Sequence, residues 1–292
     1  MRLVLSVMIG FAFHFLVGCS QENAKPANRG TAKPSQHDRN LDEFAGTPQM
    51  HTYPSPETWE HANDRQRKRA LRSFEELKKR NAPVYSGPLF VDDDEVTLQN
   101  PQDVARRTLV LWAVELRAEG IPQKEAMELI EGLDLWDTVS PEEKRFLQDD
   151  DPEPAESQEL VWRLESIWVL LWALGHVEEL NWPNGMCDVP KVVEILKPHE
   201  SNPAFIADAR LRSKAEILDA QDLIMRIHWA IRNAHLNHGG IIPDDLDWSQ
   251  DYNAVSVTMC AAVGVVEQRH YTLNWLVDFL KPKDWDHVDT PT

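Results

Sequence analysis

Residues 160–175, LVWRLESIWVLLWALG, decide the fold because they are apolar on nearly every face of a helix. Such a helix must be covered by other elements, so we expect it at the centre of the domain. Trp168 and Trp172 lie one helical turn apart within it. A sugar-stacking platform can use this spacing, but aromatic side chains inside an apolar helix are more often core.

Helix signals recur on both sides of this stretch, whereas strand patterns hardly occur. A highly charged helix is expected after Pro56, and the last helix should occupy about 257–280, before Pro282. The other predicted start signals are Asn100 with Pro101, Pro122, Ser140 with Glu143, and Ser213 with Glu216. The pattern predicts an all-α fold, a single irregular multi-helix domain packed around an apolar central helix.

The charge of the chain restricts its partners. The 292 residues include 48 Asp and Glu against 30 Lys and Arg, which gives a formal net charge of -18. Because this charge repels phosphate backbones and anionic headgroups at long range, we expect no nucleic-acid partner. An acidic surface instead suits a basic protein or another cationic ligand.

The N-terminus has the pattern of an export signal. Arg2 precedes an apolar run over 3–17, and the run closes with LVGCS, residues 16–20. Leu16 to Cys19 resembles the bacterial lipobox, in which the peptidase cuts before a cysteine that carries the lipid. We therefore predict a signal peptide over 1–18 and a lipidated, membrane-anchoring Cys19 in the cell envelope. Ser20 resembles the pattern of outer-membrane lipoproteins, if the source has two membranes.

The segment after Cys19 is polar, broken by prolines and without helical or strand periodicity. Such a composition predicts a disordered tether, here over 19–56, followed by a helical domain over 57–292. An alternative is that part of this segment packs on the domain near Phe44, Tyr53 and Trp59.

Motifs for catalysis or cofactor binding are missing: the sequence has no GxSxG, P-loop, GxGxxG, HExxH or CxxC. We therefore expect neither a cofactor nor a metal. His228, His235 and His238 share one predicted helix, but no carboxylate or cysteine completes a metal-binding spacing. Cys187 and Cys260 either form a disulfide in an oxidising envelope or remain buried thiols, and their sequence context favours thiols.

Charged residues inside apolar helices are the most informative polar feature, because an unpaired charge cannot be buried cheaply. The candidates are Arg163, Glu165, Asp219, Asp222, Arg226, Glu267, Arg269 and His270. We expect one network joining the helices around 160, 213 and 260, with Arg226 or Arg269 facing Glu165. The network has either a structural role or lines a polar cleft, and the structural role is favoured because no nucleophile or metal set accompanies it.

Five separated motifs resemble one family. They are RSFEELKKRNAPV, VWRLESIWVLLWALGHVEEL, LRSKAEILDAQDLIMRIHWA, VVEQRHYTLNWL and DWDHVDT. In this order they look like the domain of unknown function family 4272, over about residues 67–292. The resemblance implies one helical domain and supplies no activity, cofactor or catalytic residue. The family pattern usually has an acid directly before the arginine of the last helix, whereas Gln268 precedes Arg269 here and Glu267 lies one position earlier.

Three functions follow from these features. The first is an envelope lipoprotein whose acidic helical domain is a binding or interaction module. The second is an envelope enzyme that uses a polar cleft around Glu165, Asp222, Arg226 and His270. The third is an immunity-like or protective lipoprotein. Burial of those four residues would count against the enzyme.

Overall fold

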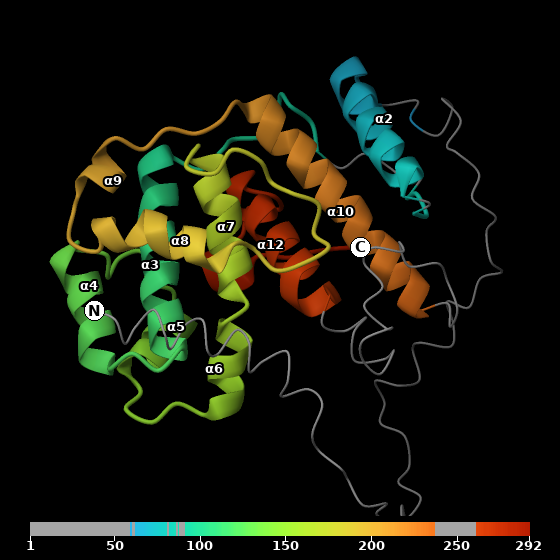
Figure 1. Ribbon diagram of the computed structural model, residues 1–292. Coiled ribbons are helices and arrows are strands. Elements are labelled where there is room, and N and C mark those ends of the chain that lie inside the picture. Colours follow the sequence, from blue (N-terminus) through green and yellow to red (C-terminus); the bar gives the residue numbers. More distant parts are fainter. Residues whose placement is uncertain (1–58, 60–61, 81, 86, 88–90, 237–260) are drawn as a thin grey trace, which may run out of the picture.

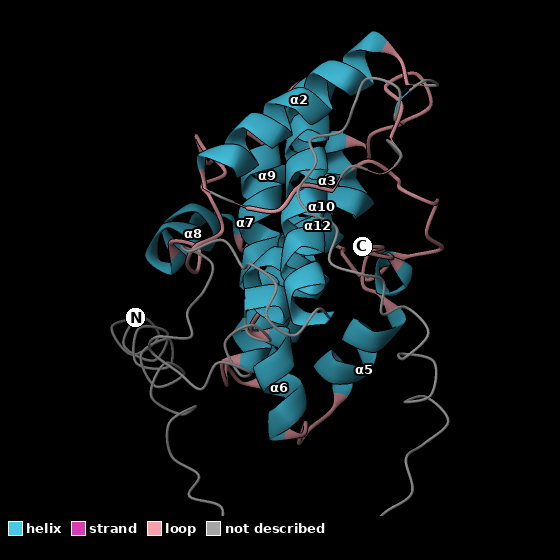
Figure 2. Ribbon diagram, turned by 90° about the vertical axis from the view of Figure 1, so that its right-hand side faces the viewer, coloured by secondary structure: helices cyan, strands magenta, loops and turns pink. Residues whose placement is uncertain are grey.

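The computed structural model describes residues 59, 62–80, 82–85, 87, 91–236 and 261–292, and in these residues it contains helices and no strand. The predicted all-α class is therefore confirmed (Figure 2). The elements are α2 (Asp64–Lys79), α3 (Pro101–Ala118), α4 (Gln123–Gly132), α5 (Pro141–Gln148), α6 (Pro154–Leu160), α7 (Arg163–Ala173), α8 (Val189–Leu196), η4 (Lys197–His199), α9 (Ala204–Ala207), α10 (Lys214–Leu236), the π-helical η6 (Ala261–Val266), α12 (Glu267–Leu276) and η7 (Trp285–His287).

Helix α7 occupies the centre, as its apolar sequence predicts. All of its residues except Arg163 are buried. α3 packs on α7, α12 packs on it as well, and α10 covers α12. α2 then lies against α10 at the edge of the molecule (Figure 1). Each large apolar side chain buried in these layers contributes about 1.5–3 kcal/mol, so the helix stack is the main source of stability.

Local capping fixes where several helices begin. Asn100 accepts a hydrogen bond from the Gln102 backbone N–H at the start of α3. Ser140 and Glu143 form the predicted capping box of α5. Ser213 and Glu216 also exchange hydrogen bonds at the start of α10. Each such cap satisfies backbone N–H groups that lack a partner within the helix.

Three helix boundaries differ from the prediction. The central helix begins at Arg163, not at Leu160, which is the last residue of α6 and is followed by a turn at residues 161–162. α2 begins only at Asp64, because Asn63 forms a capping box with Gln66, and Ser55–Thr58 lie outside the described residues. The last helix ends at Leu276, before the predicted boundary near 280. Beyond it Asp278, Leu280 and Lys281 have positive φ angles of 51°, 57° and 52°, a left-handed conformation that cannot continue a helix.

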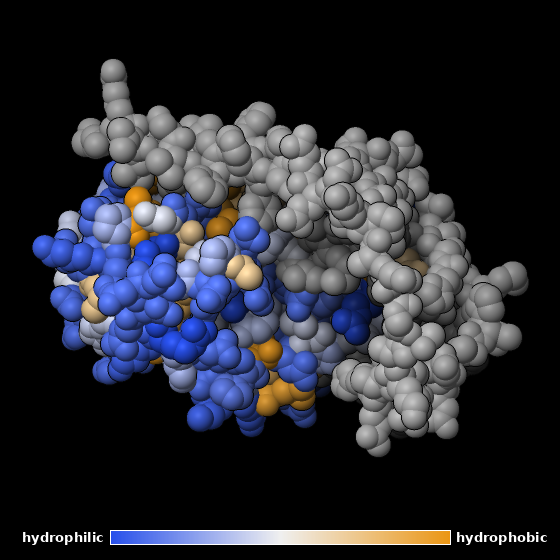
Figure 3. Space-filling view, turned by 90° about the horizontal axis from the view of Figure 1, so that it is seen from below, coloured by the Kyte–Doolittle hydropathy of each residue, from blue (hydrophilic) through white to orange (hydrophobic). Residues whose placement is uncertain are grey.

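The outer surface is mainly hydrophilic in the view from below, with small separate apolar patches (Figure 3). Within the described part of the chain, no helix combines the length and the apolar character needed to cross a membrane. The predicted signal peptide, Cys19 and the predicted tether lie outside the described residues.

Candidate functional site

A groove runs between α2 and α10 and has a volume of about 660 Å³. It is lined by residues of α2 from Arg69 to Glu76, by Arg80 directly after α2, by residues 178–183, by Arg212, by residues of α10 from Glu216 to Ile227, and by Trp172 and Arg269. We call it the α2–α10 groove. The segment that follows α7 supplies residues 178–183 and runs towards α10 before it returns to α8 (Figure 1). Three separate parts of the chain thus form the walls.

The floor of the groove is apolar. α10 contributes Ala220, Leu223, Ile224 and Ile227, which recur at the helical spacing of one face. Ala220 and Leu223 are half-buried, whereas Ile224 and Ile227 are buried. Residues Trp172, Leu180, Trp182 and Pro183 extend this apolar lining. A surface of this kind can receive apolar side chains of a ligand.

Arginines around the groove are occupied by the protein itself. Arg69 binds Asp93 at 2.6 Å, and Arg72 binds Asp219 at 2.5 Å. The Arg80 guanidinium lies 4.1 Å from the Trp182 ring centroid and pairs with Glu76 at 2.9 Å. Arg212 donates to the carbonyl oxygens of Trp172, Val177 and Glu178, and it pairs with Glu216. These cations hold the walls together.

Three acidic side chains that line the groove differ from these arginines, because they form no ion pair in the described residues. Glu75 on α2 and Glu178 and Glu179 on the opposite wall are exposed. None of them forms an ion pair with another residue in the described part of the chain. The groove therefore offers uncompensated negative charge at its rim.

The base of the groove rests on a buried ion pair between two central helices. Arg269 of α12 donates through Nε to Glu165 of α7 at 2.9 Å, and its Nη1 donates to the Asn181 carbonyl at 2.6 Å. The other Glu165 oxygen accepts the Cys187 backbone N–H at 2.5 Å. Arg269 is therefore the residue that faces Glu165, and it also fixes the segment that forms one groove wall.

Arg226 has a different partner. Its Nε and Nη2 donate to the two Asp222 oxygens at 2.9 Å each, one turn earlier on α10. Ser73 of α2 donates to the same carboxylate at 2.6 Å. Arg226 Nη1 also donates to the Tyr85 carbonyl at 2.7 Å. This buried cluster joins α2 to α10 beside the groove.

His270 belongs to a third cluster, between α10 and α12. The Asn274 amide nitrogen donates to the Asp289 carbonyl, so it must also be the donor to His270 Nε2. His270 then carries its proton on Nδ1, which lies 3.0 Å from His228 Nδ1 and donates to it. Burial lowers the pKa of His228 to about 4 and the pKa of His270 well below its ordinary value.

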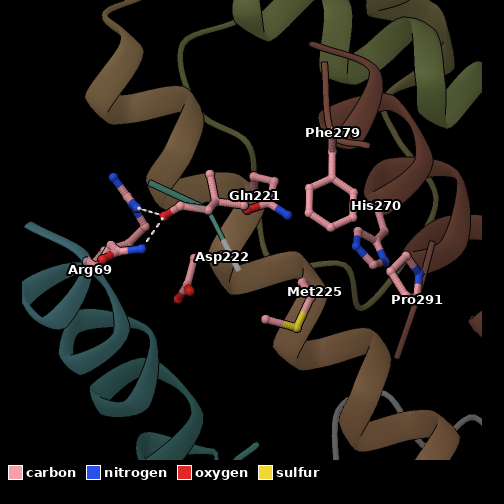
Figure 4. Close-up of a pocket in the computed structure, with 9 residues that line it drawn as sticks. Arg69, Gln221, Asp222, Met225, His270, Phe279 and Pro291 are labelled. Atoms are coloured by element: carbon pink, nitrogen blue, oxygen red, sulfur yellow. Dashed lines mark hydrogen bonds between the residues drawn. The ribbon is translucent and has the colours of Figure 1, made fainter. Parts of the chain in front are cut away.

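A small cavity lies beside this cluster. Arg69 of α2, Asp222 of α10 and His270 of α12 are among its lining residues (Figure 4). Its volume of about 20 Å³ corresponds to about one water molecule. The cavity is thus too small for an organic substrate, although two of the predicted site residues line it.

The remaining predicted residues lie apart from these clusters. Arg163 donates to Gln268 Oε1 at 3.1 Å, so the residue before Arg269 has a structural contact in this chain. Asp219 forms ion pairs with Arg69 and Arg72 at the groove. Glu267 is partly buried, and this burial raises its pKa. In the described residues the contacts of the eight side chains place them in separate clusters. The helices carry them on different faces, so they meet different neighbours.

Sequence reasoning missed several buried charges and most of the groove. Arg107 of α3 pairs with Glu143 of α5 at 2.6 Å in the interior. Glu115 of α3 is fully buried and has no hydrogen-bond partner on either oxygen among the described residues. Both lie inside an apolar helical pattern, the same signal that singled out the other eight. The groove had no comparable signal, because its walls are far apart in the sequence.

The cysteine and histidine candidates form no site in the described residues. Cys187 is a free, buried thiol, and Cys260 lies outside the described part. Burial raises the pKa of Cys187 well above its ordinary value. His228 faces His270, whereas His238 lies outside the described residues. No group of three metal-binding side chains occurs in the part that the structure describes.

The chain matches a protein-family model. The family model described as Domain of unknown function (DUF4272) matches residues 67–288, which is most of the chain. The chain therefore belongs to this family, as the five motifs predicted. Neither the curated proteins nor the solved structures gave a match.

Proposed function

We propose that this DUF4272 protein is a lipid-anchored binding module of the cell envelope and that its α2–α10 groove holds a segment of a partner. The observation that carries the proposal is the groove, which combines an apolar floor with uncompensated acids at its rim. Its walls are held by ion pairs and by hydrogen bonds of buried arginines. A preorganised wall lowers the entropy cost of binding.

Binding is better supported than catalysis. Glu165, Arg226 and His270 are buried to 0%, 0% and 1% exposure, and Asp222 to 8%. Each of them also has a hydrogen-bond partner inside the protein. Because a catalytic group must reach its substrate, their burial favours a structural role for these residues.

Anchoring through Cys19 gives the groove its place in the cell. LVGC at residues 16–19 follows a short apolar run and precedes a polar segment rich in proline. A diacylglycerol with a further acyl chain would hold the protein stably on a bilayer. The domain would then face the periplasm or the cell surface, on the outer membrane if the source has two membranes.

Lipidation is tested by Cys19→Ala in cells that are fed an alkyne-labelled fatty acid. We expect the unchanged chain to take up the label and to sediment with membranes. The Cys19→Ala chain should do neither. Cys187→Ala is the matched control, because Cys187 is buried in the domain and should not affect labelling. A Cys19→Ala chain that stays membrane-bound and is processed as before would contradict the proposed anchor.

The groove is tested by photo-crosslinking in cells, with a benzophenone amino acid placed at Leu223 of the groove floor. We expect an adduct of defined mass at this position. The control position is Glu128, which is exposed on α4 away from the groove. No adduct at Leu223, or the same adduct at both positions, would contradict binding in the groove.

A further inference from the structure

We infer that the partner segment is a cationic amphipathic helix of about three turns, lying along α10 with its apolar face on the groove floor. This inference rests on the proposed function and adds the chemistry of the ligand. Three features of the groove carry it, namely its length, the spacing of its apolar residues, and the sign of its uncommitted charge.

The length of the groove follows from its helical walls. Its lining residues extend from Arg69 of α2 to Arg80 directly after that helix, and from Glu216 to Ile227 on α10. Eleven helical steps correspond to a length of about 16 Å. A helix of the same length has about three turns. A partner helix aligned with α10 would therefore fill the groove from end to end.

The floor has the periodicity that a helix recognises. Ala220, Leu223, Ile224 and Ile227 form an i, i+3, i+4, i+7 stripe on α10. Two helices pack by placing side chains of one between such rows of the other. Small Ala220 and half-buried Leu223 leave room for the apolar side chains of an approaching helix. Ile224 and Ile227 are buried in the core, so the accessible docking face is formed by Ala220 and Leu223, which the two isoleucines support from below.

Charge determines which helix fits. The groove arginines are bound to Asp93, Asp219, Glu76, Glu216 and Glu165, so they are not available to an acidic ligand. Glu75 stands on one wall, and Glu178 and Glu179 stand on the other, all three without an ion pair in the described residues. Lysine or arginine side chains on both flanks of a central apolar face would meet these acids. The formal charge of -18 adds long-range attraction for such a helix.

The test uses the full-length protein in neutral-detergent micelles and synthetic peptides of about 14 residues with fluorescent labels. The first peptide has leucine at i, i+3, i+4 and i+7 and lysine on its other face. The second has glutamate in place of lysine, and the third has the lysine and leucine residues in scrambled order. Fluorescence anisotropy gives the Kd, and circular dichroism measures helix formation on binding.

We expect only the ordered lysine peptide to bind and to gain helix. Glu75→Gln, Glu178→Gln and Glu179→Gln together should weaken its binding about tenfold, since three exposed ion pairs are lost. Glu125→Gln, Glu128→Gln and Glu131→Gln on α4 remove the same number of charges elsewhere and should leave the Kd unchanged within about twofold. All six glutamates are exposed, so neither triple variant should affect folding.

Three outcomes overturn the inference. Equal weakening by the two triple variants would mean general charge attraction. If the glutamate peptide binds as tightly as the lysine peptide, and Leu223→Gln weakens its binding, the groove is a binding site but its ligand is not cationic. Absence of binding by every peptide would also reject the cationic helix, and crosslinking at Leu223 would then decide separately whether the groove binds anything.

Discussion

Glu165 of α7 and Glu115 of α3 are both fully buried, on helices that pack against each other, yet their surroundings differ completely. Glu165 accepts from the Arg269 guanidinium and from the Cys187 amide. Glu115 has no hydrogen-bond partner on either oxygen among the described residues. A buried carboxyl group can therefore be stabilised as half of an ion pair or retained as an uncharged acid, and the neighbouring helix decides which.

The electrostatics of this region follow from the same difference. Burial raises the pKa of Glu115 well above its ordinary value, and the nearby Glu119 carboxylate raises it further. Both causes favour the uncharged form of the Glu115 carboxyl group. Burial is also the main cause of the raised pKa of the Cys187 thiol, with Glu165 as the next cause. Cys187 therefore remains an unreactive thiol beside the ion pair.

We expect the largest effect from a substitution that removes the buried Glu165–Arg269 ion pair. Glu165→Met leaves the Arg269 guanidinium buried without its counterion, so we expect the free energy of unfolding to fall by about 3–5 kcal/mol. Glu165→Gln should show most of this loss. Denaturant unfolding measures it, with Glu128→Met on the surface of α4 as control, because that residue forms only an exposed pair with Lys124. A loss below about 1 kcal/mol for Glu165→Met would mean that the ion pair is not structural.

The same substitution at Glu115 should change the free energy of unfolding in the opposite direction. Glu115→Met removes a buried polar group without a partner and replaces it with an apolar chain of similar shape. We expect the free energy of unfolding to rise by about 1–3 kcal/mol at pH 7. Thermal and denaturant unfolding should agree. A marked destabilisation by Glu115→Met would show that this carboxyl makes an important interaction, and the contrast with Glu165 would be lost.

The sequence contained enough information to locate the buried charges but not their partners. Glu115 and Glu165 both stand inside apolar helical runs, and this pattern alone predicts burial. Whether Arg226 or Arg269 faces Glu165 depends on which face of α12 meets α7, and that is a tertiary property. Arg226 instead pairs with Asp222, one turn earlier on α10, as their i, i+4 spacing allows.

The fold was more predictable than the site for a physical reason. Caps such as Ser140 with Glu143 act within a few residues, so their sequence pattern is sufficient. The all-round apolar sequence of α7 likewise requires a covered helix. The α2–α10 groove, in contrast, has Glu75 of α2 on one wall and Glu178 and Glu179, which follow α7, on the other. No local pattern encodes that arrangement.

The smallest expected effect concerns Glu119, one turn after Glu115, where burial raises the pKa to about 7. Its ordinary value is 4.5, so the folded state holds this proton more tightly than the unfolded state. The resulting stability is fully present below pH 4.5 and is lost as the pH rises through about 7. Because Glu119 is partly exposed, solvent screening reduces the effect to about 1 kcal/mol.

The test compares two chains that both carry Glu115→Met, because the Glu119 carboxylate also raises the pKa of Glu115. Glu119→Gln should remove the pH dependence that Glu119 causes, and the difference in the free energy of unfolding between the chains with and without this substitution, measured from pH 4.5 to 8, isolates it. The pKa of His228 is lowered to about 4, so this residue reduces the stability as the pH falls, which is opposite to the effect of Glu119. His228 is present in both proteins, so its effect cancels in the difference. Glu131→Gln, exposed on α4, is the control and should follow the chain that carries Glu115→Met alone. If the stability of the chain with Glu119→Gln has the same pH dependence as that of the chain without it, the Glu119 carboxyl group is solvated. Glu115 is then the only one of these two acids whose environment differs from that of the Glu165–Arg269 ion pair.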